Sequence, residues 1–597
     1  MTDAVTVASK LDSLSATLPP LMSGTAPADA AALCALTVMA ALLARPAWRR
    51  IQLSRAKHKS IAGHSKWGKR IARLLPLYEF SSAEAFSRDG AGTTLARRRH
   101  EAFFDLGYRL LSKAPTTIAL GEQTKNSISD MQFIGRYRVP FPFSKLVRTH
   151  LRTGSFLRSA SGFEVCDLDG NRYIDLTGSF GVNVWGIDFY RECMNQAMEL
   201  AEPLGPVLGS YHPMVADNVE RLRTISGLDE VSFHMSGTEA VMQAVRLARY
   251  HTRKPYLVRF CGAYHGWWGD VQPGIGNPSN EPDTLTLADM SEHTLTVLRT
   301  RNDIACVLIN PLQALHPNIN APGDSSLIVD RNNTPADRQD YSQWLQSIAE
   351  ICRKRGIVFI MDEVFMGFRL GLRGAQDYFN VQADMVTYGK TLGGGFPVGV
   401  LCGQAQWMKR FREDRPADIC FARGTFNSHP HVMAAMNVFL KRMDSNACSN
   451  VYARLESVWN ERLKRFNDLM QSRSYPVSAE ALSTVWTLNF LTPSRYHWML
   501  QYYLRDAGLA LSWVGSGRLI FCVNMDEDVF EQVLQRFDSA CIQMKEGGWW
   551  ECPLSRKALK RVILKETLSS VFSGGAYRAA GQSTLPASVP TAQTSKA

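Results

Sequence analysis

The sequence lacks the patterns that mark a disulfide framework or a structural metal site. Its 597 residues include 12 cysteines, scattered from Cys34 to Cys552 without a C-x-x-C pair or a regular spacing. Scattered thiols of this kind are typical of a reduced cytosolic protein. The histidine pair His429 and His431 has no further Cys or His at ligand spacing, so we expect no metal ion there.

The N-terminal apolar run is too short for a membrane-spanning helix. Residues Ala30 to Ala44 are uncharged and Ala/Leu-rich, whereas a spanning helix needs ~20 apolar residues. The basic residues follow this run, and a secretory signal peptide carries them before it. We therefore expect an Ala-rich helix packed on the protein or on a partner. The alternative is a contact of residues 30–75 with an anionic membrane surface, which would attach a cytoplasmic protein to the membrane.

Acidic residues are scarce near the N-terminus. The formal charge is +12, from 67 Lys+Arg and 55 Asp+Glu. Residues 1–135 hold 18 basic and 10 acidic side chains (+8), and the other 462 hold 49 and 45 (+4). Between Arg45 and Arg73 there are ten Lys/Arg and no acid. This stretch has no recognisable nucleic-acid-reading motif, so we expect no nucleic-acid partner.

From about Arg136 the sequence alternates between strand-like and helix-like patterns. Short Val/Ile/Phe-rich runs at 230–235, 256–260, 304–309 and 358–361 are separated by helical periodicity, as at 239–250 and 341–354. This alternation indicates βαβ units and a mostly parallel sheet. Beyond His431, long amphipathic stretches precede strand-like residues 485–491 and 519–523, which favours a smaller α+β domain.

These patterns predict an α/β protein with an appended N-terminal segment. The expected parts are a basic N-terminal extension (1–135), a small α+β domain (136–200 with 431–545), a large domain (201–430) and a partly disordered C-terminal tail (546–597).

Three short motifs carry residues suited to chemistry. Ser236-Gly237-Thr238 follows a strand and opens a helix, and such a turn can cradle a phosphate through backbone N–H groups and hydroxyls, although Ser/Thr turns also serve as plain helix caps. Asp362 and Glu363 end an apolar strand, where α/β sheets build their sites. Lys390 lies between glycines after a short apolar run, where desolvation can lower the pKa of an amine.

Two further motifs lie on loops. Tyr264-His265-Gly266 follows a strand, and Gly424-Thr425-Phe426 forms another small hydroxyl turn. Together with Asp362-Glu-Val-Phe-Met-Gly-Phe-Arg369 and Gly389-Lys-Thr-Leu-Gly-Gly-Gly-Phe-Pro-Val-Gly399, the set and its order resemble the class III aminotransferases, which are pyridoxal-phosphate-dependent enzymes of fold type I. The nearest branch is glutamate-1-semialdehyde aminomutase and the aminotransferase domains of polyketide and peptide synthases. The resemblance spans about Ser144 to Met544. It implies a large domain with a mostly parallel seven-stranded sheet flanked by helices, a smaller α+β domain, and here a helical N-terminal extension.

The resemblance also implies a role for each motif. Lys390 would form the Schiff base with pyridoxal 5′-phosphate and move a proton, and Asp362 would pair with the pyridinium nitrogen. Thr425 would reach the phosphate of a neighbouring subunit, which makes a homodimer the expected working unit. The other cofactor contacts would come from Ser236, Gly237, Thr238, Tyr264, His265, Glu363 and Val364, with Val364 and Tyr264 covering the two ring faces.

One position departs from the family pattern, because Asn310 stands where the family usually has a glutamate. The reaction is expected to be a net amino transfer from an amino-acid donor to an aldehyde or ketone, and the alternatives are an internal aminomutase transfer or an inactive scaffold. The substrate is expected to be a lipid-like or carrier-bound carbonyl of secondary metabolism. The residues that could line its site are Phe180, Trp185, Tyr211 and His212, each equally a core residue, and Arg369 or Arg423 could bind a carboxylate.

Overall fold

A computed structural model describes residues 46–57, 73–260, 263–272, 283–312, 338–511 and 518–572, with the isolated residues 39, 44 and 70. The chain divides into two compact units, Met1–Lys57 and His58–Ala597. In the first unit residues 46–56 are helical, with Trp48 and Ile51 exposed. Most of the run 30–44 and of the basic stretch 58–72 lies outside the described residues, so the contact expected there stays a prediction. Within the described part of the chain, no helix is both long and apolar enough to cross a bilayer.

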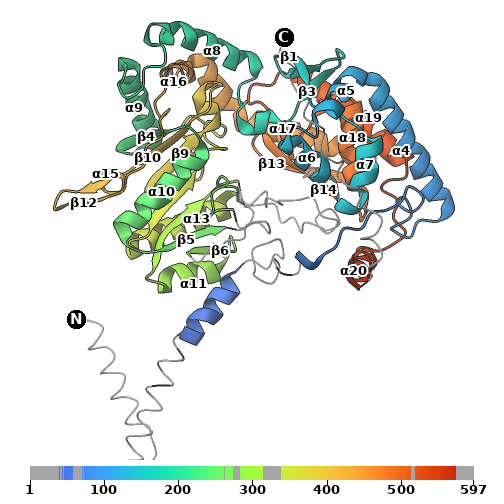
Figure 1. Cartoon of the computed structure of the whole chain (residues 1–597), viewed down its shortest axis with the longest axis horizontal. Helices are drawn as coiled ribbons and strands as arrows, with labels where there is room; N and C mark the ends of the chain where they lie inside the picture. Colours follow the sequence, from blue (N-terminus) through green and yellow to red (C-terminus); the bar gives the residue numbers. More distant parts are fainter. Residues whose placement is uncertain are drawn as a thin grey trace, which may run out of the picture. The chain divides into compact units, whose positions relative to one another are not determined.

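The second unit contains a seven-stranded sheet in the order β4-β10-β9-β8-β7-β5-β6 (Figure 1). Strand β10 is antiparallel to both neighbours, and the remaining pairs are parallel. This confirms the predicted mostly parallel sheet. The strands are β4 (Glu230–His234), β5 (Tyr256–Phe260), β6 (Thr284–Leu287), β7 (Ile304–Ile309), β8 (Val358–Asp362), β9 (Met385–Gly389) and β10 (Gly399–Gly403).

Helices cover both faces of this sheet. Every residue of β7, β8, β9 and β10 is buried, and successive strand residues point to opposite faces, so both faces must be covered. Helix α10 (Gly237–Thr252) packs with Val241 and Ala244 in a core that includes Leu308 and Ile360. Trp344 packs edge-on against Phe260 of β5 at 5.1 Å between ring centroids. The other helices of this part are α11 (Glu292–Thr300), α13 (Arg338–Arg355), α14 (Gly374–Tyr378) and α15 (Ala405–Met408), and β11 (Phe411–Arg412) pairs with β12 (Arg415–Ile419).

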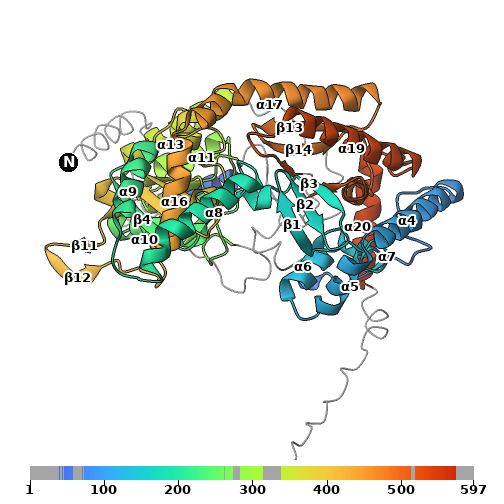
Figure 2. The ribbon, with the colours of Figure 1, turned by 90° about the horizontal axis from the view of Figure 1, so that it is seen from above.

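A long helix leads from the large sheet towards the smaller ones. Helix α16 (Pro430–Met443) packs against α8 (Ile187–Ala201) and α9 (Pro213–Ser226), and Figure 2 shows α8 and α16 side by side. Helix α17 (Asn446–Ser472) follows it and packs on β13. Asn437 of α16 donates to Asn218 of α9 at 2.9 Å inside this contact, which satisfies a buried amide.

Two small sheets complete the α+β part. One has the order β1-β2-β3-β15 and the other β13-β14-β16. Trp459, Trp486, Phe521 and Phe530 pack together between α17, the second sheet and α19. The division into a large and a small domain at the predicted boundaries stays a prediction. The elements are β1 (Leu157–Ser161), β2 (Glu164–Asp167), β3 (Arg172–Asp175), β13 (Val477–Leu482), β14 (Val485–Phe490), β15 (Leu509–Ala510), β16 (Arg518–Ile520), α18 (Leu500–Asp506) and α19 (Glu527–Glu546), with short 3-10 helices η2 (Gly178–Gly181), η3 (Glu202–Leu204), η4 (Lys390–Gly393) and η5 (His497–Met499).

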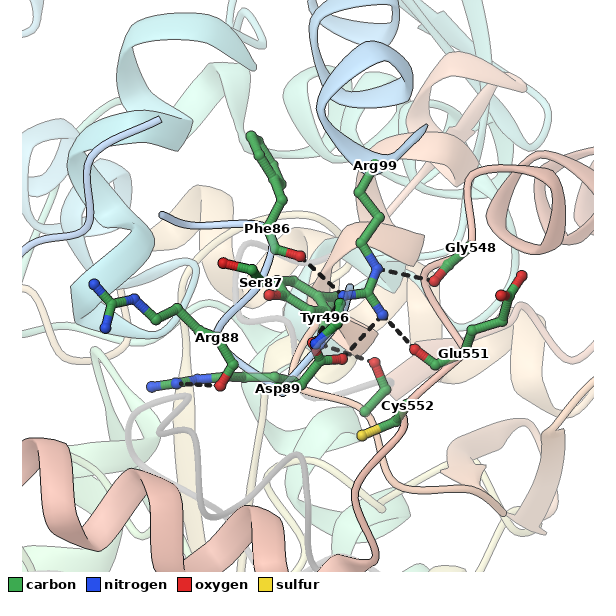
Figure 3. Close-up of polar contacts among 12 residues, drawn as sticks. Phe86, Ser87, Arg88, Asp89, Arg99, Tyr496, Gly548, Glu551 and Cys552 are labelled. Carbon is green, nitrogen blue, oxygen red and sulfur yellow. Dashed lines mark hydrogen bonds and ion pairs between the residues drawn. The ribbon is translucent and has the colours of Figure 1, made fainter. Parts of the chain in front are cut away.

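The residues before Arg136 include helices that pack on the α+β part. Arg99, on the first of them, is fully buried, and its guanidinium makes a bidentate pair with Asp89 at 2.9 Å (Figure 3). The same guanidinium donates to the carbonyls of Phe86, Gly548 and Glu551. Two segments 449 residues apart are thereby joined. The elements at the two ends are α4 (Thr93–Lys113), α5 (Pro115–Thr124), α6 (Ser129–Tyr137), η1 (Phe141–Phe143), α7 (Ser144–His150) and α20 (Arg556–Phe572).

Candidate active site

The turn between β4 and α10 contains two hydrogen bonds that cap the N-terminus of the helix. Ser236 is the N-cap, and its hydroxyl accepts from the backbone N–H of Glu239 at 3.3 Å. The Glu239 carboxylate accepts in return from the N–H of Met235 at 2.9 Å. The N–H groups of Gly237 and Thr238 take part in neither of these two hydrogen bonds. They lie at the start of α10, where the helix dipole favours an anion.

Glycines bring four segments close together at this turn. A Cβ on Gly237 would lie 2.6 Å from Val364, and one on Gly399 would overlap the carbonyl oxygen of Ser236. A Cβ on Gly266 would lie 2.5 Å from the Thr238 hydroxyl. The β4–α10 turn therefore lies against the segment after β8, the start of β10 and the Tyr264-His265-Gly266 loop.

Asp362 ends β8 in a buried network. Its Oδ2 is 2.7 Å from His265 Nδ1, and its Oδ1 accepts from the Thr387 hydroxyl at 3.0 Å and from the Val364 N–H at 3.1 Å. Asp362 and His265 are 2% and 1% exposed. A carboxylate has about four acceptor positions, so three are used and one remains. His265 Nε2 is buried without a hydrogen-bond partner among the described residues.

Lys390 follows β9 directly and has a left-handed backbone (φ 50°). Its Nζ donates to the carbonyl of Phe180 at 2.7 Å and lies 4.6 Å from the ring centroid of Phe365. Burial lowers the pKa of Lys390 to about 8, because the nearby carboxylate of Asp362, which raises it, only partly offsets desolvation. The charge of Arg369 lowers the pKa further. An amine with this pKa is partly neutral near physiological pH, as a nucleophile requires.

The turn whose carbonyl accepts the hydrogen bond from Lys390 has a strained backbone. Ser179 and Phe180 have φ values of 45° and 57°, a left-handed conformation that non-glycine residues rarely adopt. A Cβ on the next residue, Gly181, would lie 2.5 Å from the Phe365 ring. Strained backbone of this kind occurs at ligand-binding sites. The sequence indicates Phe180 only as a residue whose side chain could line the site, and it gives no signal for the contribution of the Phe180 carbonyl.

Arg369 is another residue whose place the sequence did not reveal. It is fully buried, and its Nη1 donates to the Thr484 hydroxyl at 2.8 Å and to the Phe521 carbonyl at 2.7 Å. It thus links the segment after β8 to the β13-β14-β16 part of the chain. Its Nε and Nη2 have no hydrogen-bond partner among the described residues.

Glu363, Tyr264 and Thr425 differ from the other predicted cofactor residues in their hydrogen-bond partners or in their exposure. The carboxylate of Glu363 accepts from the N–H groups of Ala375 and Gln376 at 2.7 and 3.2 Å, so it caps the first turn of α14. Burial raises the pKa of Glu363 to about 7. Tyr264 is 51% exposed, and Thr425 is exposed on a loop.

The residues that could line the substrate site or bind a substrate carboxylate differ in their burial. Trp185 is 4% exposed and packs on Phe189 and Tyr452, so it is a core residue. His212 caps α9 through its Nδ1, which accepts from the Met214 N–H. Phe180, Tyr211 and Arg423 are exposed.

Asn310, the departure from the family pattern, closes a local turn. Its Oδ1 accepts from the backbone N–H of Leu312 at 3.1 Å, directly after β7. The side chain is 9% exposed.

The family model for class III aminotransferases, "Aminotransferase class-III", matches residues 148–273 and 337–540. These two stretches cover more than half of the chain. The chain belongs to the class III aminotransferases. This confirms the predicted family, enzyme class and cofactor, pyridoxal 5′-phosphate.

Curated relatives of this class III aminotransferase include glutamate-1-semialdehyde 2,1-aminomutases. The one from Flavobacterium psychrophilum is 30% identical over 355 residues, which is 57% of this chain and 77% of the relative. The one from Alkaliphilus oremlandii is 32% identical over 308 residues, 49% of this chain and 67% of the relative.

Solved structures share the fold. A glutamate-1-semialdehyde aminomutase from Pseudomonas aeruginosa aligns with a TM-score of 0.59 at 16% identity, over 76% of this chain and 99% of that one. A β-phenylalanine aminotransferase from Variovorax paradoxus aligns with a TM-score of 0.59 at 19% identity, over 75% and 98%. This confirms the predicted fold.

The residues present fit the family's cofactor. The N–H groups of Gly237 and Thr238 lie at the start of α10, where the helix N-terminus suits a phosphate. Asp362 has an unused acceptor position for a protonated ring nitrogen, and Lys390 supplies an amine of lowered pKa.

Proposed function

We propose that this class III aminotransferase moves an amino group from an amino-acid donor to an aldehyde or ketone, in secondary metabolism. The observation that carries the proposal is the surroundings of the Lys390 amine. Its Nζ lies against the Phe365 ring and bonds to the carbonyl of Phe180. An aromatic ring at the reacting nitrogen favours an apolar carbonyl substrate over a small charged one.

Pyridoxal phosphate, when bound, supplies an electron sink that stabilises negative charge at the substrate carbon. In our proposal Lys390 holds the cofactor covalently and later moves a proton at its Nζ. Asp362 keeps the ring nitrogen protonated, and His265 and Thr387 fix the two oxygens of its carboxylate. Ser236, Gly237 and Thr238 bind the phosphate at the start of α10. Val364 and Tyr264 cover the two faces of the ring.

Asn310 changes the electrostatics of this site relative to the family. An amide there adds no negative charge near the cofactor, so Asp362 is the carboxylate on which proton handling depends. The amide oxygen is already used by the Leu312 N–H, so we assign Asn310 a structural role.

We also propose a homodimer in which Thr425 binds the phosphate of the partner subunit. The supporting observation is the exposed apolar surface around this loop, where Phe421 and Phe426 are 69% and 53% exposed. Apolar patches of this kind mark interfaces. Sedimentation equilibrium should give twice the chain mass, and Thr425→Ala should weaken phosphate retention. A monomer that retains the cofactor fully would contradict this proposal.

An internal amino transfer is the second candidate, because the relatives at 30–32% identity are named aminomutases. The two reactions differ in their need for a second substrate. A net aminotransferase releases a keto product from the donor and consumes a separate acceptor, whereas a mutase needs neither.

The experiment is therefore a panel of amino donors, tested with and without aldehydes and ketones of increasing chain length. We expect conversion of donor and acceptor in equal amounts, with preference for apolar acceptors. The Phe365→Ala variant tests the role of the aromatic ring. It should lose the preference for apolar acceptors while retaining the covalently bound cofactor. Complete turnover of glutamate 1-semialdehyde alone, with no response to apolar aldehydes, would establish the mutase instead.

A further inference from the structure

Helix α20 (Arg556–Phe572) is attached to the protein by one face. Leu559 is fully buried on that face, and the carboxylate of Glu566 lies 2.6 Å from Arg495 and 3.7 Å from Arg88. Arg495 is itself 1% exposed. A buried side chain and a partly buried ion pair hold the helix in a fixed rotation about its axis, so its outer face is defined.

The outer face combines apolar and basic side chains. Leu564, Leu568 and Val571 follow one another at spacings of four and three residues, which places them on one stripe of the helix. They are 58%, 48% and 37% exposed, and Phe572 at the end is 86% exposed. The basic side chains on the exposed surface of the helix are Lys557, Lys560, Arg561 and Lys565.

The charge of this face has one sign. The four basic side chains form no ion pair with any described residue, and Glu566, the single acid of the helix, faces inward. Helix α17 provides the contrast. Its exposed cations Arg454 and Lys464 alternate with acids such as Glu456 and Glu461, as an ordinary solvated helix surface does.

Charge excludes two coverings from within the protein. The N-terminal segment between Arg45 and Arg73 has ten Lys/Arg and no acid, so it would be repelled. A second copy of α20 would bring the same four cations to the contact and would also be repelled. An anionic occupant complements the charge of this face, and its surface must also accept an apolar stripe.

We propose that the outer face of α20 binds an anionic lipid surface. An apolar stripe flanked by Lys and Arg is the pattern of a helix that lies in the headgroup region, with its apolar side chains inserted and its cations among the headgroups. Each Lys or Arg near an anionic surface adds to the attraction, and this attraction falls as salt rises. The contact uses no residue of the cofactor site, so it is independent of the reaction.

The experiment is sedimentation of the full chain, loaded with its cofactor, with phosphatidylcholine vesicles that do or do not contain phosphatidylglycerol. The wild-type protein should bind the mixed vesicles, and salt should release it. The triple variant Lys560→Gln, Arg561→Gln, Lys565→Gln should bind on the order of a hundredfold more weakly. The matched control, Lys354→Gln, Arg454→Gln, Lys464→Gln, removes the same charge from α13 and α17 and should bind like the wild type.

A second variant tests the apolar stripe. Leu564→Ser with Leu568→Ser changes two exposed side chains, so the unfolding midpoint should stay the same while vesicle binding weakens. The proposal is overturned if the wild-type protein does not prefer vesicles with phosphatidylglycerol. It is also overturned if the α20 variants bind as the wild type does, which would place any lipid contact in the N-terminal segment. A loss of self-association in the α20 variants, with unchanged lipid binding, would instead show a second copy on this face and would equally overturn it.

Discussion

Two of the buried carboxylates among the described residues, Asp89 and Asp362, differ in how completely their partners use their hydrogen-bonding groups. Asp89 pairs with Arg99, whose guanidinium nitrogens also reach three backbone carbonyls (Figure 3). Asp362 pairs with His265, whose Nε2 has no partner among the described residues. The first network is closed, and the second has donor and acceptor capacity left over.

The difference distinguishes a structural network from a candidate ligand-binding site. A buried polar group without a partner costs free energy, so natural proteins keep few of them. At the end of β8 the unused capacity lies beside a lysine of lowered pKa and a strained turn. In the described part of the chain, each of the three guanidinium nitrogens of Arg99 has a hydrogen-bond partner. The expected role of Arg99 is to hold α4 to the segment around Gly548.

The largest effect should come from Lys390→Ala. Because this amine holds the cofactor and moves the proton, we expect turnover to fall on the order of a thousandfold or more. The unfolding midpoint of the cofactor-free protein should not fall, since a desolvated amine is removed. Steady-state kinetics measures the turnover, and thermal unfolding measures the midpoint. Turnover within a few-fold of the wild type would remove Lys390 from the mechanism.

Arg99→Met should show the opposite pattern. Removing one partner of a buried ion pair leaves Asp89 uncompensated, and we expect a loss of about 3–5 kcal/mol in the free energy of unfolding. The kinetic constants of the folded protein should not change. Urea unfolding followed by circular dichroism measures the loss. The matched variant Arg98→Met removes an exposed neighbour and should cost far less, so equal losses would argue against a special role for Arg99.

The pH dependence of cofactor capture should report the amine of Lys390. Its pKa in the folded protein is about 8 instead of 10.5, so the neutral fraction, and the rate of capture, should rise about tenfold from about pH 7 to 9 and then level off. In the same cofactor-free protein the unfolded chain binds the extra proton between pH 8 and 10.5. Stability should therefore increase as pH rises through that window.

Stopped-flow absorbance of cofactor-free protein mixed with pyridoxal phosphate measures the rate. Asp362→Asn is a useful comparison, because the charge of Asp362 raises the pKa of Lys390 and its loss should move the midpoint to lower pH. A rate that continues to rise up to pH 10 would mean that Lys390 has its ordinary pKa.

The smallest effect should come from Ser236→Ala. The N-cap hydroxyl accepts a single bond from Glu239, and its loss should cost about 1 kcal/mol of stability. The same hydroxyl is proposed to contact the phosphate, so cofactor affinity should fall several-fold as well. Equilibrium titration with pyridoxal phosphate distinguishes the two. A change in stability alone would reduce Ser236 to a helix cap.

The sequence was sufficient to predict the mostly parallel sheet, because the signals of its strands are local. A strand followed by a small-residue turn and a helix is visible within about fifteen residues, as at 230–250. The sequence also indicates that the side chains of Asp362 and Glu363 point to opposite sides, since neighbouring residues of an extended chain do so.

The rest depends on contacts between distant residues. No local pattern shows that Arg99 meets Gly548 or that Arg369 reaches Phe521. Nor does the sequence show that Ser179 and Phe180, which are not glycines, take a left-handed turn and present a carbonyl to Lys390. Such a turn is set by its surroundings, not by residue preference.

The most direct test of the central claim is to find where the cofactor is attached. The wild-type protein should be reduced with borohydride in the presence of pyridoxal phosphate, digested and analysed by mass spectrometry. The account predicts one phosphopyridoxyl group per chain, on the peptide that contains Lys390, and none after Lys390→Ala. Stoichiometric labelling of another lysine, or no labelling of Lys390, would contradict it.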